Sequence, residues 1–169
     1  QHFAGGVLLL IYKPFVKEDF IEAQGHKGTV KELRIFNTVL HTLDNKVVFI
    51  PNGPLSTGSI VNYSREKQRR IDSVFSISYG SDIKKAKDII TGVIESNPKI
   101  LKDPLPVIGV KELASSSVVL ESRVWVNNAD LVELGFYMNE AVKNAFDSNG
   151  IIMPFPQMDV NLKKIQGNE

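Results

Sequence analysis

Residues 3–15, FAGGVLLLIYKPF, form an apolar run ahead of an otherwise polar sequence. A helix that crosses a bilayer needs about 20 apolar residues, so this run is too short to cross one alone. A cleavable signal peptide would place cations before its apolar core, whereas Lys13 follows this core. Two interpretations remain: a core helix of a soluble domain, or the last turns of a membrane helix whose preceding part lies upstream.

The adjacent glycines Gly5 and Gly6 help to choose between these interpretations. Each glycine weakens a soluble helix by about 1 kcal/mol relative to alanine. In a membrane bundle, small residues instead permit close contact between helices. The pair therefore favours a packed helix at a pore or at the edge of a membrane, and we expect the chain to continue something larger.

The composition indicates a folded chain. Of its 169 residues, 43% are hydrophobic and 23% are charged, which excludes general disorder and allows one ordinary domain or two small ones. The chain has no Cys, which removes disulfides, thiolate catalysis and Cys-ligated metals and fits a reducing compartment. The net charge is +1, but residues 63–70 carry four basic side chains and one acidic side chain. The excess positive charge is therefore concentrated in this short segment.

Residues 18–63 show short strand patterns separated by turns, which is typical of a small β-barrel. The candidate strands are residues 19–23, 28–35, 37–43, 46–50 and 59–63. Residues 47–50 are all apolar, which predicts a strand covered on both faces. The sequence Pro51-Asn52-Gly53-Pro54 then ends this strand, because proline cannot donate a ladder hydrogen bond. We expect a rigid corner there.

Residues 64–70 lack apolar periodicity and are predicted to link two domains. In residues 71–150, alternation over 71–79 predicts a strand, and residues 83–94 have a helical apolar stripe that Asp82 would cap. Strands are expected at 107–113 and 118–126. Asp130 and Glu133 resemble a capping box before a second helix that ends at Asn149-Gly150. The predicted order is β, α, β, β, α.

The C-terminal part combines a proline-containing spacer, residues 151–157, with a single amphipathic strand in residues 158–169. Met158, Val160 and Leu162 form the apolar side of this strand. A lone strand can neither bury its apolar face nor pair its backbone. It either returns to its own sheet or pairs with copies from other chains in a closed barrel, and the stiff spacer favours the second arrangement.

Motifs for catalysis or metal binding are poor. The three histidines lie far apart without carboxylates at ligand spacing, so we predict no metal and no cofactor. Residues 115–117 are serines in a predicted turn and do not form a nucleophile motif. Residues 25–28, Gly-His-Lys-Gly, join two predicted strands and indicate a hairpin turn rather than a phosphate clamp. The basic segment could bind phosphates, but a solvated linker is the commoner role of such a segment.

Several short motifs, taken in order, resemble the C-terminal half of small-conductance mechanosensitive channels of the MscS type, and the resemblance covers essentially the whole chain. These motifs are Gly6-Val7-Leu8-Leu9-Leu10 with Lys13-Pro14-Phe15, Gly28-Thr29-Val30, Ile50-Pro51-Asn52-Gly53, Asn62-Tyr63-Ser64-Arg65, Tyr79-Gly80-Ser81-Asp82, Ile100-Leu101-Lys102-Asp103, Arg123-Val124-Trp125, and Pro154-Phe155-Pro156-Gln157-Met158-Asp159-Val160.

The resemblance implies an α+β fold with a definite domain order. Residues 1–17 would hold the second half of a pore-lining helix, 18–63 an Sm-like β-barrel domain, 64–70 a basic linker and 71–150 a ferredoxin-like α/β domain. Residues 151–157 would be a spacer, and residues 158–169 a strand of a parallel barrel between subunits. The barrel strand would use Met158, Val160 and Leu162.

The resemblance also implies a homoheptamer in the cell inner membrane, multi-pass in the full-length protein, with this portion mainly cytoplasmic. Such channels release ions and small solutes on hypo-osmotic shock; this part would assemble and filter rather than gate. Its partners would be sister copies, the lipid bilayer through upstream helices, and permeating ions and solutes, without nucleic acid or enzymatic activity. We expect His2, Gly5 and Gly6 on the helix to approach Asn52 and Gly53, so that helix motion reaches the β domain.

Two alternatives come from other functional classes. An Sm-like barrel next to a basic linker would also suit an RNA-binding ring. The order β, α, β, β, α also opens a ferredoxin-like fold, which would suit a ligand-binding regulatory module. Salt-sensitive RNA retention would indicate the first alternative, and ligand-induced thermal stabilisation the second.

Overall fold

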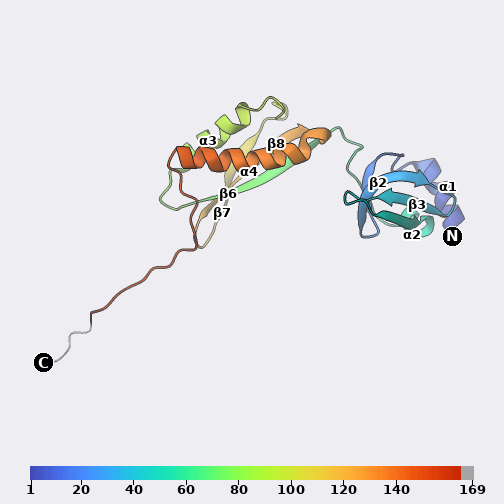
Figure 1. The fold of residues 1–169 in the computed structure, drawn as a ribbon, viewed down its shortest axis with the longest axis horizontal. Helices are drawn as coiled ribbons and strands as arrows, with labels where there is room; N and C mark the ends of the chain where they lie inside the picture. Colours follow the sequence, from blue (N-terminus) through green and yellow to red (C-terminus); the bar gives the residue numbers. More distant parts are fainter. Residues whose placement is uncertain (165–169) are drawn as a thin grey trace. The chain divides into compact units, whose positions relative to one another are not determined.

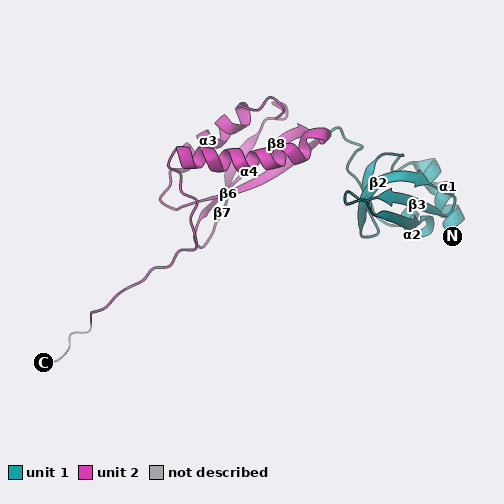
Figure 2. Ribbon diagram, viewed as in Figure 1, with its two compact units in different colours: residues 1–67 teal, residues 68–169 magenta. Residues whose placement is uncertain are grey.

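The computed structural model describes residues 1–164, and the chain divides into two compact units (Figures 1 and 2). Unit 1 comprises Gln1–Lys67 and unit 2 comprises Gln68–Glu169. Each unit combines helices with an antiparallel sheet, so the α+β fold class is confirmed.

Unit 1 is a five-stranded antiparallel sheet with the linear order β4-β3-β2-β1-β5. Its elements are α1 (His2–Tyr12), β1 (Phe20–Ala23), β2 (His26–Leu33), β3 (Asn37–His41), β4 (Val47–Pro51), α2 (Asn52–Thr57) and β5 (Ile60–Asn62). All five strands expected from the sequence are present, with small shifts at their ends. The core contains buried side chains from α1, from the strands and from α2, including Leu9, Ile21, Val30, Leu40 and Leu55.

Two predictions for residues 46–54 are corrected by the structure. Strand β4 buries Ile50 but leaves Val47 and Phe49 half exposed, because β4 is an edge strand and covers the core with one face only. The expected corner after Pro51 is the start of helix α2. Proline at position 54 fits this first helical turn, where a backbone N–H has no helical partner to lose.

Unit 2 is a three-stranded antiparallel sheet with the order β6-β8-β7. Its elements are β6 (Gln68–Ile77), α3 (Ile83–Glu95), β7 (Val107–Leu113), β8 (Val118–Asn127), the 3-10 turn η1 (Asn128–Asp130) and α4 (Leu131–Ser148). The predicted order β, α, β, β, α is therefore confirmed. Because β8 runs antiparallel to both neighbours, β6 and β7 run parallel to each other with β8 between them, which is the split βαβ arrangement of ferredoxin-like folds.

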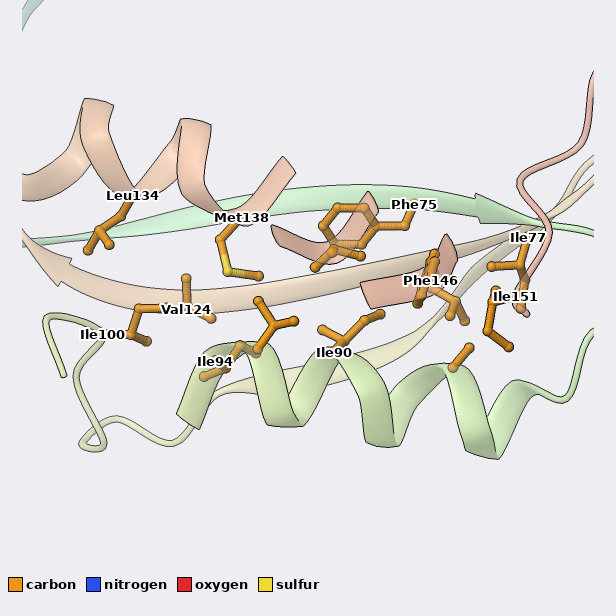
Figure 3. Close-up of a cluster of buried hydrophobic side chains, with 14 of the residues drawn as sticks. Phe75, Ile77, Ile90, Ile94, Ile100, Val124, Leu134, Met138, Phe146 and Ile151 are labelled. Atoms are coloured by element: carbon orange, nitrogen blue, oxygen red, sulfur yellow. The ribbon is translucent and has the colours of Figure 1, made fainter. Parts of the chain in front are cut away.

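The two helices of unit 2 and one face of its sheet enclose the core. Alternate residues of β8 are buried, and the apolar stripes of α3 and α4 pack against this face (Figure 3). Phe146 of α4 contacts Phe75 of β6 edge to face, with ring centroids 6.3 Å apart. The periodicities that predicted these helices correspond to the buried faces, although Ile83 at the start of α3 is 39% exposed.

Of the two N-terminal caps predicted for the helices of unit 2, the structure confirms one. Asp82 caps α3, because its Oδ1 accepts a hydrogen bond of 3.0 Å from the Lys85 backbone N–H. The capping box at Asp130 and Glu133 is wrong, since Asp130 makes no side-chain cap bond. Both carboxylates instead face Lys99, at N–O distances of 3.7 Å and 2.8 Å. Lys99, which follows α3, therefore binds the two carboxylates that were predicted to cap α4.

The basic linker is shorter than predicted. Strand β6 begins at Gln68, so residues 68–70 pair with β8 rather than connect the units. Pairing satisfies the backbone groups that face β8, which a sequence without apolar periodicity does not reveal. Arg70 also forms an ion pair with Asp72, with 2.6 Å between Nε and Oδ1.

Residues 151–164 contain no helix and no strand. Ile151 is buried in unit 2, and the Ile152 carbonyl accepts a hydrogen bond from the Ser78 N–H. Further along, Met158, Val160 and Leu162 are exposed, so this segment does not return to its own sheet. Residues 165–169 of the predicted terminal strand lie outside the described residues.

Candidate functional site at the first helix

Helix α1 approaches the start of α2 so closely that only glycine fits at position 5. A Cβ placed on Gly5 would lie 2.5 Å from the Asn52 carbonyl oxygen and 2.9 Å from the Gly53 nitrogen. These are backbone atoms, which cannot move aside as the end of a side chain can. The backbones of α1 and α2 therefore meet directly.

Gly6 makes a second close approach, towards the turn between β2 and β3. A Cβ on Gly6 would lie 2.6 Å from the Ile35 carbonyl oxygen and 3.0 Å from Asn52 Nδ2. Successive glycines thus place α1 against two separate pieces of the β domain. We call this contact surface, formed by residues 34–36 together with Asn52 and Gly53, the α1 seat.

Asn52 connects the two parts of the α1 seat and is fully buried. Its Nδ2 donates to the Arg34 and Ile35 carbonyl oxygens at 2.8 Å and 3.1 Å. Its Oδ1 accepts a hydrogen bond of 2.8 Å from Thr38 Oγ1, and its backbone N–H donates to the Phe36 carbonyl at 2.9 Å. Both donors and the acceptor of the amide are therefore satisfied, as a buried polar side chain requires.

His2 and Gly53 meet at the first turn of α1. A Cβ on Gly53 would lie 2.8 Å from His2 Nδ1. The structure thus brings His2, Gly5 and Gly6 together with Asn52 and Gly53. The other predicted group, Met158, Val160 and Leu162, belongs to unit 2 and is described above.

The C-terminal end of α1 is also anchored within unit 1. Lys13 ends the helix in the left-handed conformation, with φ 45°, and its N–H donates to the Leu9 carbonyl at 3.0 Å. Asn62 Nδ2 donates to the Pro14 carbonyl, and Arg65 Nη2 to the Lys13 carbonyl, each at 3.0 Å. Both ends of α1 are therefore held by hydrogen bonds or close contacts to the β domain.

The sequence did not predict that Thr38, Asn62 and Arg65 contribute to the anchoring of α1; Arg65 was considered only as part of the basic segment. Thr38 precedes the apolar pair Val39-Leu40 in its strand. A hydroxyl buried beside such a pair needs a hydrogen-bond partner, and this need is the signal that could have found Thr38. Asn62 and Arg65 lie more than 40 positions from the carbonyls that they bind, as the separations of 48 and 52 residues show. No local pattern reports contacts across such distances.

Several large apolar side chains of α1 remain exposed beside the seat and beyond it. Phe3, Leu10, Ile11 and Tyr12 each expose more than half of their side chain. Among residues 1–164, no helix combines the length and the apolarity needed to cross a membrane. Within the same range no cluster of His, Cys, Asp and Glu could hold a metal ion.

The basic segment has partners within the protein. Arg65 binds the Lys13 carbonyl, and Arg70 binds Asp72. The bond from Arg70 lowers the pKa of the Asp72 carboxyl below its usual range. These two guanidinium groups therefore serve structural contacts in the chain.

Comparison with known proteins gives matches over both units. The model for the β-domain of mechanosensitive ion channels matches residues 1–65, and the model for the C-terminal domain of the mechanosensitive ion channel MscS matches residues 71–153. A small-conductance mechanosensitive channel of Edwardsiella ictaluri is 44% identical over 162 residues, which are 96% of this chain and 57% of that protein. One of Helicobacter pylori is 37% identical over 95% of this chain and 59% of that protein.

Solved structures agree with these matches. The crystal structure of Helicobacter pylori MscS in its closed state superposes with a TM-score of 0.92 at 36% identity, covering 97% of this chain and 65% of that one. The structure of Arabidopsis thaliana MSL1, 21% identical with a TM-score of 0.77, shares the fold.

A helix seated on a five-stranded domain and followed by a βαββα domain defines a protein of the mechanosensitive channel class. The chain belongs to the MscS family of mechanosensitive ion channels. It spans between 57% and 59% of the length of the Edwardsiella and Helicobacter relatives. The matches support the channel interpretation and support neither the RNA-binding ring nor the ligand-binding module.

Proposed function

We propose that this chain forms the pore-helix end and the cytoplasmic vestibule of a mechanosensitive channel that releases ions and small solutes on hypo-osmotic shock. The observation that carries the proposal is the direct backbone contact between α1 and the α1 seat. In a chain of this family, that contact joins the helix next to the pore to a folded domain. The chain itself assembles and filters, and tension sensing belongs to the membrane part of the full-length protein.

The geometry of the α1 seat supports a coupling role. No flexible side chain lies between Gly5 and the Asn52 carbonyl, so a shift of α1 displaces backbone atoms of the β domain. Asn52 distributes this displacement, because its four hydrogen bonds reach Arg34, Ile35, Phe36 and Thr38. The site is thus built for transmission of movement rather than for chemistry, and we propose that the chain has no enzymatic activity and takes no cofactor.

The coupling role can be tested by patch-clamp recording from the full-length channel. Asn52→Ala removes the amide, and Gly53→Pro adds a ring where His2 lies close to the backbone. We expect both variants to change the tension threshold or the decay of the current under sustained tension. Asn139→Ala, at an exposed position of α4, is the matched control. Unchanged gating in both seat variants would contradict the coupling role.

We further propose that the chain works as a homo-oligomer, a heptamer by resemblance to the family. Edge strand β4 exposes Val47 and Phe49, and the terminal segment exposes Met158, Val160 and Leu162. Seven copies of residues 158–162 would close a parallel barrel, in which each strand gains the backbone partners that it lacks alone. Sister copies are therefore the main protein partner, and nucleic acid is not one.

Assembly can be tested by native mass measurement. The chain should form a discrete oligomer, and truncation before Met158 should loosen it. A chain that lacks only residues 165–169 serves as the control for truncation itself. A stable monomer at micromolar concentration would count against the barrel and the vestibule together.

The membrane location is proposed from the exposed apolar side chains of α1. Phe3, Leu10, Ile11 and Tyr12 would face lipid or neighbouring helices at the inner membrane of the cell. In cells that lack other osmotic channels, the full-length protein should restore survival after a sudden drop in osmolarity. Failure of an expressed, membrane-inserted protein to do so would contradict the channel function.

A further inference from the structure

Thr38 is the second residue of β3 and is fully buried. Its Oγ1 donates a hydrogen bond of 2.8 Å to Asn52 Oδ1. We propose that Thr38 is a positioning residue of the α1 seat, whose hydroxyl fixes the Asn52 amide on which Gly6 rests. The meaning of this role for gating rests on the proposed coupling function, whereas its effect on the docking of α1 can be measured separately.

The orientation of the Asn52 amide follows from its neighbours. The carbonyl oxygens of Arg34 and Ile35 can only accept hydrogen bonds, so Nδ2 must face them. Oδ1 then points to the other side of the amide, where Thr38 Oγ1 is its donor. Without the hydroxyl, Oδ1 would be a buried acceptor with no donor, which is an unfavourable state.

Gly6 has little room for a displaced amide. A Cβ on Gly6 would already lie 3.0 Å from Asn52 Nδ2 and 2.6 Å from the Ile35 carbonyl oxygen. Rotation of the Asn52 amide to find another donor would move Nδ2 and release the carbonyls of residues 34 and 35. The surface beneath α1 would then change, although Thr38 itself acts on α1 only through Asn52.

The polarity of Thr38 distinguishes this role from simple packing. Its neighbours Val39 and Leu40 are buried and apolar, and valine has the same β-branched shape as threonine, so a valine at position 38 would fill the same space in the strand. A hydroxyl at this buried position has a use only through its hydrogen bond. The bond joins β3 to the first residue of α2, which lies directly under α1.

The experiment measures docking of α1 by disulfide formation in the full-length channel, in a background free of other cysteines. The reporter pair is His2→Cys with Gly53→Cys, at the two positions that meet in the first turn of α1. Thr38→Val and Thr38→Ala remove the hydroxyl, whereas Thr38→Ser retains it. Thr42→Val is the matched control, because the Thr42 hydroxyl bonds Asp44 and Lys46 in the turn between β3 and β4.

Loss of a donor to a buried acceptor should lower the rate of disulfide formation by about tenfold in Thr38→Val and Thr38→Ala. Thr38→Ser and Thr42→Val should remain close to the parent. The effect of Thr38→Val should vanish when Asn52→Ala is already present, because Thr38 acts through that amide. If Thr38→Val disturbs folding, Thr38→Ala still tests the role of the hydroxyl, because alanine is smaller than threonine.

The possible outcomes separate this inference from the proposed function. The tension threshold is recorded in channels that retain His2 and Gly53, without the reporter cysteines. Slower docking together with an altered tension threshold supports both. Slower docking with unchanged gating supports the positioning role of Thr38 and contradicts coupling through the α1 seat. An unchanged docking rate in both Thr38→Val and Thr38→Ala overturns the inference, as does an equal effect of Thr42→Val.

Discussion

Helices α1 and α4 both pack against the rest of their own unit, but they do so by opposite means. Helix α1 brings its backbone to the backbone of the α1 seat through Gly5 and Gly6, and buries Leu9 beside them. Helix α4 keeps its backbone away and inserts large side chains, among them Met138 and Phe146, both fully buried. The first contact is defined by shape and permits no added atom, whereas the second is stabilised by buried apolar area.

These two kinds of contact suit two different tasks, stabilising the fold and transmitting movement. The burial of apolar area stabilises unit 2 and has no preferred direction, so it depends little on small displacements within the core. Helix α4 is therefore a constant part of the fold. A contact through glycine buries little area, but it transmits any displacement directly to the opposing backbone. This is the contact expected if α1 transmits movement, as we propose. Four experiments test whether the two contacts differ in this way.

The largest effect is expected from Phe146→Ala in α4. Removal of this fully buried ring should lower the free energy of unfolding of unit 2 by about 3–5 kcal/mol, because a cavity remains among Phe75 and its neighbours. Unfolding in denaturant, monitored by hydrogen exchange in each unit, measures the change in free energy. Phe136→Ala on the same helix, where the ring is 71% exposed, should change stability by less than about 0.5 kcal/mol. Equal effects would show that α4 does not depend on its buried side.

The next effect is expected from Gly5→Ala in α1. A methyl group 2.5 Å from the Asn52 carbonyl forces the backbones apart and should cost about 1–3 kcal/mol in the stability of unit 1. Gly92→Ala in α3 is the matched control, because a Cβ there meets nothing within 4 Å. That control should stabilise unit 2 by about 0.5–1 kcal/mol through helix propensity. If Gly5→Ala is tolerated as well as Gly92→Ala, the seat is not a close contact.

A smaller effect is expected from Asp82→Ala at the start of α3. Loss of the bond to the Lys85 N–H should cost about 0.5–2 kcal/mol, and Asp82→Asn should restore most of it. Asp130→Ala, at the wrongly predicted cap of α4, removes only a 3.7 Å ion pair with Lys99. Its cost should stay below about 1 kcal/mol, as is usual for ion pairs near the surface. Thermal unfolding of unit 2 compares Asp82→Ala with Asp130→Ala. A larger loss of stability in Asp130→Ala would support the capping box after all.

The smallest effect is expected on the stability of unit 2 at acidic pH. The bond from Arg70 lowers the pKa of Asp72, and the bond from Lys111 lowers the pKa of Glu121. Carboxyls with a lowered folded-state pKa stabilise unit 2 above their unfolded values near 3.8 and 4.5, and this contribution is lost as the pH falls through the folded values. Unfolding measured from pH 6 to pH 2 should show a shallower decline in Asp72→Asn. An identical slope would mean that the pair with Arg70 does not couple to folding.

Most of unit 2 could be predicted from its sequence because its signals are local. The apolar stripes of α3 and α4 and the alternation in β8 follow from residues within one element. Asp82 caps its own helix, so its role is visible three residues away. Asp130 failed as a cap because Lys99, more than 30 residues earlier in the chain, binds its carboxylate and that of Glu133.

The candidate site was only partly predictable. The glycine pair in the first helix and the Asn-Gly step after a strand are visible in the sequence. Together with the family resemblance, they predicted the contact between α1 and Asn52-Gly53. The interpretation of residues 51–54 as a corner missed helix α2, since a short helix has too few residues for a periodic signal. Thr38, Asn62 and Arg65 act through partners that are distant in sequence, so their roles needed coordinates.

The sequence by itself determined the α+β class, the order of the elements in unit 2 and the faces of its long helices, because the periods of helices and strands are written in consecutive residues. Only the tertiary structure decided that α1 rests on the Asn52 amide and the Ile35 carbonyl, that Thr38 completes this amide, and that β6 extends into the predicted linker. Hydrogen bonds and steric fit act over a few ångströms in space, and which residues come that close is set by the packing of the whole unit.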